Sequence, residues 1–324
     1  MNRVVRIHET GGPEVLTWDE LEIGDPGPGQ VRLRQTAIGL NFIDAYHRSG
    51  LYALPQLPAV LGREAAGVVE LVGRGVVGFR PGDRAAYALD AGAYAECRLI
   101  AADRLVPLPD DIDDRQAAGM MLKGLTAHYL LRRTYRVGYG DTILLHAAAG
   151  GVGLIACQWA RHLGATVIGT VGSREKADLA RAHGCHHTIL YRDEDFVERV
   201  RELTDGRGVP VVYDSVGRDT FDRSLDCLAP LGLMVSFGQA SGPVPPFPIG
   251  KLAAKGSLFL TRPTLVTYIE KREDLLSAAQ ELFEVVRSGA VRIEVRQFYP
   301  LSEAARAHRE MESRTTTGSS VLLP

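Results

Sequence analysis

Residues 144–170 read LLHAAAGGVGLIACQWARHLGATVIGT, and this stretch decides the fold. A short apolar run ends in a cluster of small residues, in which the segment 151–156 (GVGLIA) fits the pattern G-x-G-x-x-G/A. A helix-like run follows, and residues 165–171 form a second apolar run. The order strand, glycine turn, helix and strand is that of the dinucleotide-binding βαβ unit.

The spacing of the small residues fits the contacts that a dinucleotide requires. Gly151 permits a tight turn, Gly153 lets the backbone approach a pyrophosphate, and Ala156 keeps the helix close to the sheet. The helix N-terminus at Gly151, Val152 and Gly153 offers N–H groups and the positive end of the helix dipole to phosphates. A purely structural glycine turn is the alternative, and the strand–helix–strand context favours nucleotide binding.

The residues after the second strand indicate which dinucleotide binds. An NAD-binding unit usually has Asp or Glu about 20 residues after the first glycine, whereas residues 170–176 here read TVGSREK. A carboxylate at the strand end would repel a 2′-phosphate, whereas Ser173, Arg174 and Lys176 would attract one. We therefore expect NADPH rather than NADH. The alternative is a solvated first helical turn, and Glu175 weakens the phosphate interpretation.

The composition indicates a globular protein of two domains. The chain has 324 residues, of which 45% are hydrophobic and 23% charged, values that are ordinary for soluble domains. The formal charge of −2 gives no bulk attraction to nucleic acid or to a membrane. The four cysteines form no C-x-x-C pattern, so we expect free thiols rather than disulfides or a structural zinc site. The absence of a long apolar run predicts a cytoplasmic protein.

The pattern of predicted elements changes along the chain. Roughly the first 120 residues read as short strands separated by turn signals, which suggests a β-barrel-like domain. From Asp141 strands alternate with helices, which predicts a doubly wound parallel sheet and places the chain in the α/β class. The tail from Asp274 returns to mixed structure, and we expect it to rejoin the first domain.

Two chemical routes are common for an oxidoreductase built in this way. One uses a catalytic zinc ion held by Cys and His. The other places the nicotinamide against a substrate with its own electron sink. The two segments richest in polar groups, 41–48 and 62–67, contain no Cys–His pair. We therefore expect chemistry without a metal.

Seven short motifs are spread along the chain: 11–16 (GGPEVL), 41–44 (NFID), 62–67 (GREAAG), 81–84 (PGDR), 122–127 (LKGLTA), 147–153 (AAAGGVG) and 213–217 (YDSVG). Together they resemble the NADPH:quinone oxidoreductases, the zeta-crystallin-like and zinc-free branch of the medium-chain dehydrogenase/reductase superfamily. In zinc-dependent relatives a Cys stands where this chain has Asn41, and a His stands where it has Arg63. Both ligand positions are replaced, which agrees with the expectation of metal-free chemistry.

This resemblance implies a GroES-like β-barrel catalytic domain formed by residues 1–123 and 264–324, and a Rossmann NADPH-binding domain formed by residues 124–263. It also implies a homodimer that transfers reducing equivalents from NADPH to quinones in a cleft between the domains. Ser173, Lys176 and Tyr191 would flank the 2′-phosphate, and Asn41 would lie near the nicotinamide. The residues that the resemblance places around the cofactor are Asn41, Lys123, Thr126, Ser173, Lys176, Tyr191, Ser215, Phe237 and Arg314.

Three polar residues of the first domain are candidates for the substrate site. Asn41 is expected to bind cofactor or substrate, with a turn residue as the alternative. Tyr46 and Tyr52 would line the quinone pocket, by stacking or by donating to a developing oxyanion; packing at the core or rim is the alternative. Asp44 is expected to stabilise a turn or an ion pair rather than to act as an acid.

Other polar residues of the motifs receive mainly structural interpretations. We expect Arg63 and Glu64 to form an ion pair behind the pocket. Lys123 would contact cofactor hydroxyls or phosphate, with a solvated helix lysine as the alternative. His146 ends the first strand of the parallel sheet, and we expect it to be buried rather than catalytic.

The mechanism that these residues favour is direct hydride transfer from NADPH to a quinone, whose reduced form can take protons from water. One alternative is reduction of an activated C=C bond in an enone or enal, for which Tyr46 or Tyr52 would supply the proton. A second alternative is a non-catalytic NADPH-binding protein, such as a crystallin or an RNA-binding protein. The balanced charge argues against RNA binding.

Overall fold

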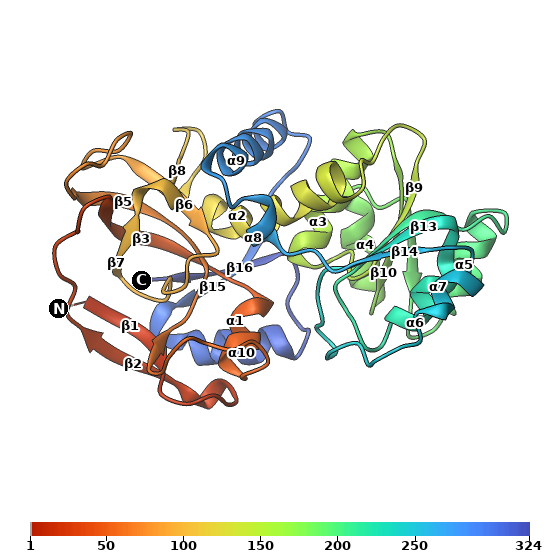
Figure 1. Cartoon of the computed structure of the whole chain (residues 1–324), viewed down its shortest axis with the longest axis horizontal. Coiled ribbons are helices and arrows are strands. Elements are labelled where there is room, and N and C mark those ends of the chain that lie inside the picture. Colours follow the sequence, from red (N-terminus) through yellow and green to blue (C-terminus); the bar gives the residue numbers. More distant parts are fainter. Residues whose placement is uncertain (1) are drawn as a thin grey trace. The chain divides into compact units, whose positions relative to one another are not determined.

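The computed structural model describes residues 2–324, which form two compact units (Figure 1). The first unit comprises Met1–Lys123, Lys271–Gln280 and Ile293–Pro324, and the second comprises Gly124–Glu270 and Glu281–Arg292. Helices α2 (Asp114–His128) and α9 (Arg272–Arg287) each contribute residues to both units. The domain limits expected from the sequence, at 123/124 and 263/264, stay a prediction.

The second unit is built on a six-stranded sheet in the order β11-β10-β9-β12-β13-β14, and every neighbouring pair is parallel. The chain starts at β9 in the middle of the sheet and adds β10 and β11 on one side. It then returns to the middle and adds β12, β13 and β14 on the other side, as in dinucleotide-binding sheets. The prediction of a doubly wound parallel sheet is confirmed. The strands are β9 (Thr142–Leu145), β10 (Thr166–Val171), β11 (His187–Leu190), β12 (Val209–Asp214), β13 (Leu228–Ser236) and β14 (Phe259–Thr261).

Helices connect these parallel strands, and Figure 1 shows α3 to α7 around the sheet. Apolar side chains of the strands and helices form one core, which includes Leu144, Ile168, Phe196 and Met234. The helical segments are a π-helical turn (Tyr129–Thr134), α3 (Gly151–His162), α4 (Arg174–Ala182), α5 (Phe196–Leu203), α6 (Phe221–Ser224), a 3₁₀ turn (Leu225–Cys227), α7 (Gly250–Ala254) and α8 (Leu265–Tyr268).

The sequence of α3 explains both where it forms and how it packs. Leu154, Ile155 and Trp159 recur at helical spacing and are all buried, and each contributes about 2 kcal/mol through the apolar area it removes from water. The helix ends at His162, and Gly164 follows with φ +85°, a left-handed conformation that favours glycine after a helix.

The first unit contains two sheets. The larger has the order β15-β16-β3-β5-β6-β8, with β7 also paired to β3, and the smaller has the order β2-β1-β4. The strands are β1 (Asn2–Ile7), β2 (Leu16–Leu21), β3 (Gln30–Leu40), β4 (Ala59–Val60), β5 (Glu64–Val72), β6 (Arg84–Ala88), β7 (Cys97–Ala101), β8 (Val106–Pro107), β15 (Val295–Pro300) and β16 (Ser319–Leu323).

The strand pairings within residues 2–324 do not close the larger sheet into a ring, because β15 and β8 are its two ends. The expected β-barrel-like domain is thus present as an open sheet. Strand β3 pairs with β5 along one edge, with two register shifts that are typical of bulges, and with β7 and β16 along the other. Two different strands therefore share one edge of a long strand, a pattern that the short strand signals of the sequence do not specify.

The C-terminal segment completes the first unit. Strand β16 pairs with β3 (Leu322 opposite Ile38), so the tail rejoins the first unit as expected, except for Glu281–Arg292, which belong to the second unit. Buried side chains from both segments, including Leu33, Ile38, Tyr87 and Met311, form the core of this unit. Its helical segments are 3₁₀ turns at Pro13–Val15, Ala102–Arg104 and Leu301–Glu303, together with α1 (Phe42–Arg48) and α10 (Ala304–Glu312).

Three further properties concern residues 2–324. No helix in this range combines the length and the apolar character that crossing a bilayer requires. No group of three or more His, Cys, Asp and Glu side chains in this range is arranged to hold a metal ion. All four cysteines are free.

Candidate functional site

Four of the predicted cofactor residues follow directly after strands of the parallel sheet. Ser173 comes two residues after β10, and Tyr191, Ser215 and Phe237 come immediately after β11, β12 and β13. Since the strands are parallel, their carboxyl ends meet at one edge of the sheet. Ligands of open α/β sheets bind at this edge, so the fold gathers these four residues where a dinucleotide would bind.

The glycine turn between β9 and α3 has two glycines with different roles. A Cβ on Gly153 would lie 2.4 Å from the carbonyl oxygen of Ala147, so this glycine allows the helix to pack closely on the strand end. A Cβ on Gly150 would meet only the Ala147 oxygen, at 3.2 Å. Gly150 is the N-cap of α3, and no side chain caps the helix. Gly150 is therefore the less crowded of these two glycines, and its role as N-cap was not predicted from the sequence although it precedes the GVG signal directly.

Ser173 and Tyr191 lie beside the turn that leads from β10 into α4. The Ser173 hydroxyl accepts a hydrogen bond from the Lys176 N–H (3.3 Å) and caps the helix. The Tyr191 N–H donates to the Val171 carbonyl (3.2 Å), and a Cβ on Gly172 would lie 2.7 Å from the Tyr191 hydroxyl. The phenol therefore covers the backbone of Gly172, and the predicted phosphate-binding residues Ser173, Lys176 and Tyr191 share one end of the strand pair β10–β11.

Asp214 fixes the turn in which Ser215 lies, and the sequence analysis did not assign it a role. Its fully buried carboxylate accepts from the N–H groups of Val216 (2.7 Å) and Gly217 (3.1 Å). The Phe237 N–H donates to the Asp214 carbonyl oxygen (2.8 Å), which ties the end of β13 to that of β12. An Asp immediately before S-x-G is the sequence signal for this turn, since short carboxylates bond nearby backbone N–H groups.

His146 joins the ends of neighbouring strands and is buried as expected. Its Nδ1 lies 2.9 Å from the Thr170 hydroxyl, and its Nε2 lies 2.8 Å from the Ser224 hydroxyl. Burial lowers the pKa of this imidazole, which favours the neutral form. A neutral histidine with a hydrogen bond at each ring nitrogen holds β9 and β10 together at the edge where they meet the candidate cofactor site.

In the first unit, Asn41 belongs to a buried polar cluster around Glu64. The Glu64 carboxylate accepts from Asn41 Nδ2 (2.8 Å), from Lys123 Nζ (3.1 Å) and from the Leu122 N–H (2.7 Å). Glu64 is fully buried, and Asn41 and Lys123 are nearly so. The cluster fixes the amide plane of Asn41 and ties α2 to the start of β5.

This cluster corrects two expectations about charged residues. Glu64 pairs with Lys123 rather than with Arg63, because consecutive residues of an extended chain point to opposite faces. The Arg63 Nη1 instead donates to the Leu89 carbonyl (2.6 Å). The alternative of a solvated Lys123 is also wrong, since Glu64 draws the ammonium into the interior.

Tyr46 and Tyr52 form an aromatic pair. Their ring centroids are 5.2 Å apart with the planes at 66°, an edge-to-face arrangement, and the Tyr52 N–H donates to the Tyr46 carbonyl (3.0 Å). Both rings are half-buried. The structure thus brings the two predicted substrate residues together, on α1 and the segment that follows it.

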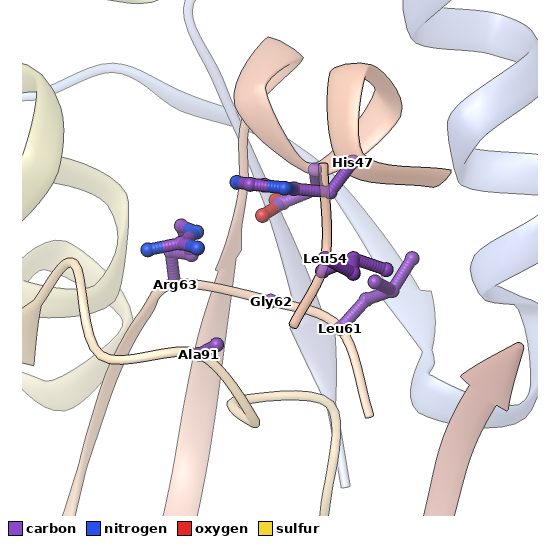
Figure 2. Close-up of a pocket in the computed structure, with 7 residues that line it drawn as sticks. His47, Leu54, Leu61, Gly62, Arg63 and Ala91 are labelled. Carbon is purple, nitrogen blue, oxygen red and sulfur yellow. The ribbon is translucent and has the colours of Figure 1, made fainter. Parts of the chain in front are cut away.

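Asp44 stabilises the start of α1, as the sequence predicted. Its Oδ2 accepts from the Asn41 N–H (2.9 Å), which satisfies a donor at the helix N-terminus. Its side chain is 1% exposed, and burial raises its pKa to about 7. The same carboxyl lines a small pocket with His47 and Arg63 (Figure 2).

Two predicted cofactor residues occupy other positions. Thr126 is buried in α2, within the second unit. Arg314 is exposed after α10 in the first unit, with φ +60°. A non-glycine residue in this left-handed conformation is uncommon.

Comparison with known proteins identifies the family. The family model "Alcohol dehydrogenase GroES-like domain" matches residues 27–131, and the model "Zinc-binding dehydrogenase" matches residues 151–281. The chain is 57% identical to a quinone oxidoreductase from Pseudomonas aeruginosa over the full length of both proteins. The chain belongs to the quinone oxidoreductase family, within the medium-chain dehydrogenase/reductase superfamily.

Solved structures of quinone oxidoreductases share this fold. A crystal structure of an Escherichia coli quinone oxidoreductase complexed with NADPH is 52% identical, covers 100% of both chains and has a TM-score of 0.98. A 2-haloacrylate reductase from Burkholderia sp. is 51% identical over 98% of both chains. Membership in the family therefore confirms the GroES-like and Rossmann assignments of the two parts of the chain.

Proposed function

We propose that this protein is an NADPH-dependent quinone reductase. The observation that carries the proposal is full-length similarity to quinone oxidoreductases at 57% identity, combined with a parallel sheet after whose strands four of the expected cofactor residues follow. When bound, NADPH supplies the hydride that reduces the quinone.

The residues at the carboxyl edge fit a phosphorylated dinucleotide. The N-terminus of α3 has no side-chain cap and begins after Gly150, which has no side chain of its own, so N–H groups there are available to a pyrophosphate. Ser173, Lys176 and Tyr191 would hold the 2′-phosphate, because they offer hydroxyl and ammonium donors. Gly151, Val152, Gly153, Ser215 and Phe237 would line the rest of this edge.

In the proposed site, the residues of the first unit orient the nicotinamide and the substrate. The Asn41 amide is held by Glu64, so its side chain is pre-organised. Tyr46 and Tyr52 present a rigid aromatic pair on which a quinone ring can stack. Lys123, Thr126 and Arg314 complete the set that we propose around the cofactor.

We propose that the reaction proceeds without a metal. The Asn41 amide nitrogen donates to Glu64, and the Arg63 guanidinium is a cation. Neither group is the thiolate or imidazole that zinc binds.

We also propose a cytoplasmic homodimer. Four free thiols fit a reducing compartment. The edge strand β14 exposes Phe259 and Leu260, and an apolar edge of this kind can be extended by a second copy. A Leu260→Lys variant should shift the mass measured by sedimentation equilibrium from dimer to monomer.

The second candidate is reduction of activated C=C bonds, which the similarity to a 2-haloacrylate reductase favours. A substrate panel with NADPH oxidation as the readout separates the two functions. Fast turnover of 1,4-benzoquinone with slow turnover of enones and 2-chloroacrylate supports quinone reduction. Fast enone turnover with none of 1,4-benzoquinone would show that the second candidate is right.

A further inference from the structure

A small pocket in the first unit contains buried polar atoms that lack partners (Figure 2). Figure 2 shows the nitrogen atoms of His47 and Arg63 on one side, and Leu54 and Leu61 on the other. The cavity volume is about 10 Å³, which is about the room that one water molecule needs. The lining residues are Asp44, His47, Leu54, Leu61, Gly62, Arg63 and Ala91.

Three of these residues present polar atoms that complement a water molecule. Asp44 Oδ1, His47 Nδ1 and Arg63 Nε are buried and have no hydrogen-bond partner among residues 2–324. Asp44 and His47 are more than nine-tenths buried. The Arg63 N–H is a donor, whereas an ionised Asp44 oxygen is an acceptor. A water molecule can accept from the first and donate to the second, and two to four such partners are typical of a buried water.

The other oxygen of Asp44 is held by a hydrogen-bond chain with a fixed direction. Arg48 can only donate, so its Nη1 donates to His308 Nδ1 (3.0 Å). The neutral His308 then carries its proton on Nε2, which lies 2.9 Å from the Tyr94 hydroxyl. The Tyr94 O–H in turn donates to Asp44 Oδ2 (3.2 Å). Arginine does not release a proton, so this row of hydrogen bonds positions Asp44 but does not return a proton to it. A proton can therefore reach the carboxyl only at Oδ1.

We propose that Asp44 supplies the proton for quinone reduction, and that it does so through one water molecule bound between Asp44 Oδ1, His47 Nδ1 and Arg63 Nε. The proposal rests on the proposed function, in which Asn41 lies near the nicotinamide, and the Asn41 N–H bonds directly to Asp44. It differs from the sequence-based expectation, which gave Asp44 a structural role alone.

The step balances as a proton transfer that follows hydride transfer. The hydride, with its electron pair, comes from NADPH and converts the quinone to a hydroquinone anion. The Asp44 O–H bond breaks, the water passes a proton on, and a new O–H bond forms on the hydroquinone oxygen. Asp44 is left as a carboxylate and takes its next proton from solvent water by the same route.

The charged groups around Asp44 agree with this role. Burial raises the pKa of Asp44, and this is the largest effect on it. The Asn41 N–H, the Tyr94 hydroxyl and the positive charges of Arg63 and Lys123 act in the opposite direction and lower it. Burial also lowers the pKa of His47 to about 4, so the imidazole that lines the pocket is neutral. The net value for Asp44, about 7, suits a group that must gain and lose a proton.

The test compares Asp44→Asn with Asp83→Asn. Asp83 also accepts a backbone N–H, that of Arg80 (2.8 Å), but lies at the surface. We expect Asp44→Asn to lower kcat with 1,4-benzoquinone about 100-fold and to remove the pH dependence near 7 and the solvent deuterium isotope effect. The dissociation constant for NADPH should not change. Asp83→Asn should behave as the wild type.

Tyr94→Phe provides a second variant whose effect a structural role would not produce. Removing the Tyr94 donor raises the pKa of Asp44, so the fall in kcat at high pH should move upward by about one pH unit. An unchanged pH profile in both Asp44→Asn and Tyr94→Phe would overturn the proposal.

Infrared spectra of the wild type without substrate measure the protonation of Asp44 independently of quinone reduction, so they test the proposal separately from the proposed function. A protonated-carboxyl band should lose most of its intensity between pH 6 and pH 8, and this change should be missing from Asp44→Asn. A wild type that lacks this change in the band would overturn the role of Asp44 as proton donor, even if quinone is reduced. A wild type with the band but without quinone turnover contradicts the proposed function, and with it the role of the proton.

Discussion

The ammonium of Lys123 lies 3.1 Å from Oε2 of Glu64, in a part of the first unit where the Glu64 side chain is 0% exposed and that of Lys123 is 8% exposed. Such a pair stabilises a fold mainly because each charge would be costly alone. The Glu64 carboxylate also accepts from Asn41 and from the Leu122 backbone, so its position sets those of three other groups.

Replacement of Glu64 should therefore be strongly destabilising. Glu64→Ala leaves Lys123 and Asn41 without their acceptor, and we expect the free energy of unfolding to fall by about 3–5 kcal/mol, measured by urea denaturation. The matched control is Glu70→Ala on the same strand, whose carboxylate pairs with Arg32 (3.1 Å) and Arg34 (3.3 Å) at the surface. Glu70→Ala should lower the free energy of unfolding by no more than about 1 kcal/mol. Equal losses in the two variants would contradict the account of the cluster.

The two glycines at the start of α3 should respond differently to alanine. Gly153→Ala puts a methyl group against the Ala147 oxygen, so it should lower the melting temperature and weaken NADPH binding together. Gly150→Ala makes a tight contact at 3.2 Å with the Ala147 oxygen, against 2.4 Å for Gly153→Ala, and its backbone is extended (φ −80°), so it should cost less stability than Gly153→Ala. Its methyl group would meet the pyrophosphate instead, and we expect the KM for NADPH to rise about tenfold. Normal NADPH binding by Gly150→Ala would show that the phosphates lie elsewhere.

Gly172 should be required because Tyr191 covers it. Gly172→Ala would place a methyl group 2.7 Å from the Tyr191 hydroxyl and displace the phenol. We expect the KM for NADPH to rise about tenfold, as expected for loss of a hydrogen bond to a charged group, with little change for NADH. The double variant Gly172→Ala/Tyr191→Leu removes the clash, so its KM should equal that of Tyr191→Leu alone. Additive effects in this double-mutant cycle would contradict the contact.

Acid should destabilise the fold through His308. Burial lowers its pKa to about 3, below the usual 6.5, so the unfolded chain binds a proton that the folded chain does not. Stability from this group is present above pH 6.5 and is lost as pH falls toward 3. Asp44 acts in the opposite sense, because its raised pKa gives stability that is lost as pH rises through about 7.

His308→Gln isolates the first effect, since glutamine keeps a donor and an acceptor but does not titrate. We expect the free energy of unfolding of both proteins to fall between pH 6.5 and pH 4. The loss in the wild type should exceed that in His308→Gln by on the order of 3 kcal/mol, as measured by urea denaturation at each pH. Parallel pH profiles would show that His308 is not held neutral in the folded state.

The strongly periodic parts of the fold could be predicted from the sequence. The glycine turn, the parallel sheet and the return of the tail to the first unit follow from local patterns and chain order. The open sheet of the first unit could not be derived in this way, because β3 shares one edge between β7 and β16, a long-range pairing.

The candidate site shows the same division. Ser173 and Tyr191 could be placed because they follow predicted strands. Two contacts of the site join side chains far apart in the sequence. Lys123 is 59 residues from its partner Glu64, and Tyr94 is 50 residues from Asp44, whose Oδ2 accepts its O–H. Hydrogen bonds of this separation leave no periodic signal in the chain.

Steady-state oxidation of NADPH by 1,4-benzoquinone, after dialysis against EDTA, tests the central claim most directly. The account predicts quinone-dependent oxidation that the chelator does not reduce, with kcat/KM at least about tenfold higher for NADPH than for NADH. Lys176→Ala should lose most of this preference, whereas Lys251→Ala, a lysine bonded to Asp222 at the surface, should keep it. An enzyme that leaves 1,4-benzoquinone unreduced, or that needs its metal restored, would contradict the account.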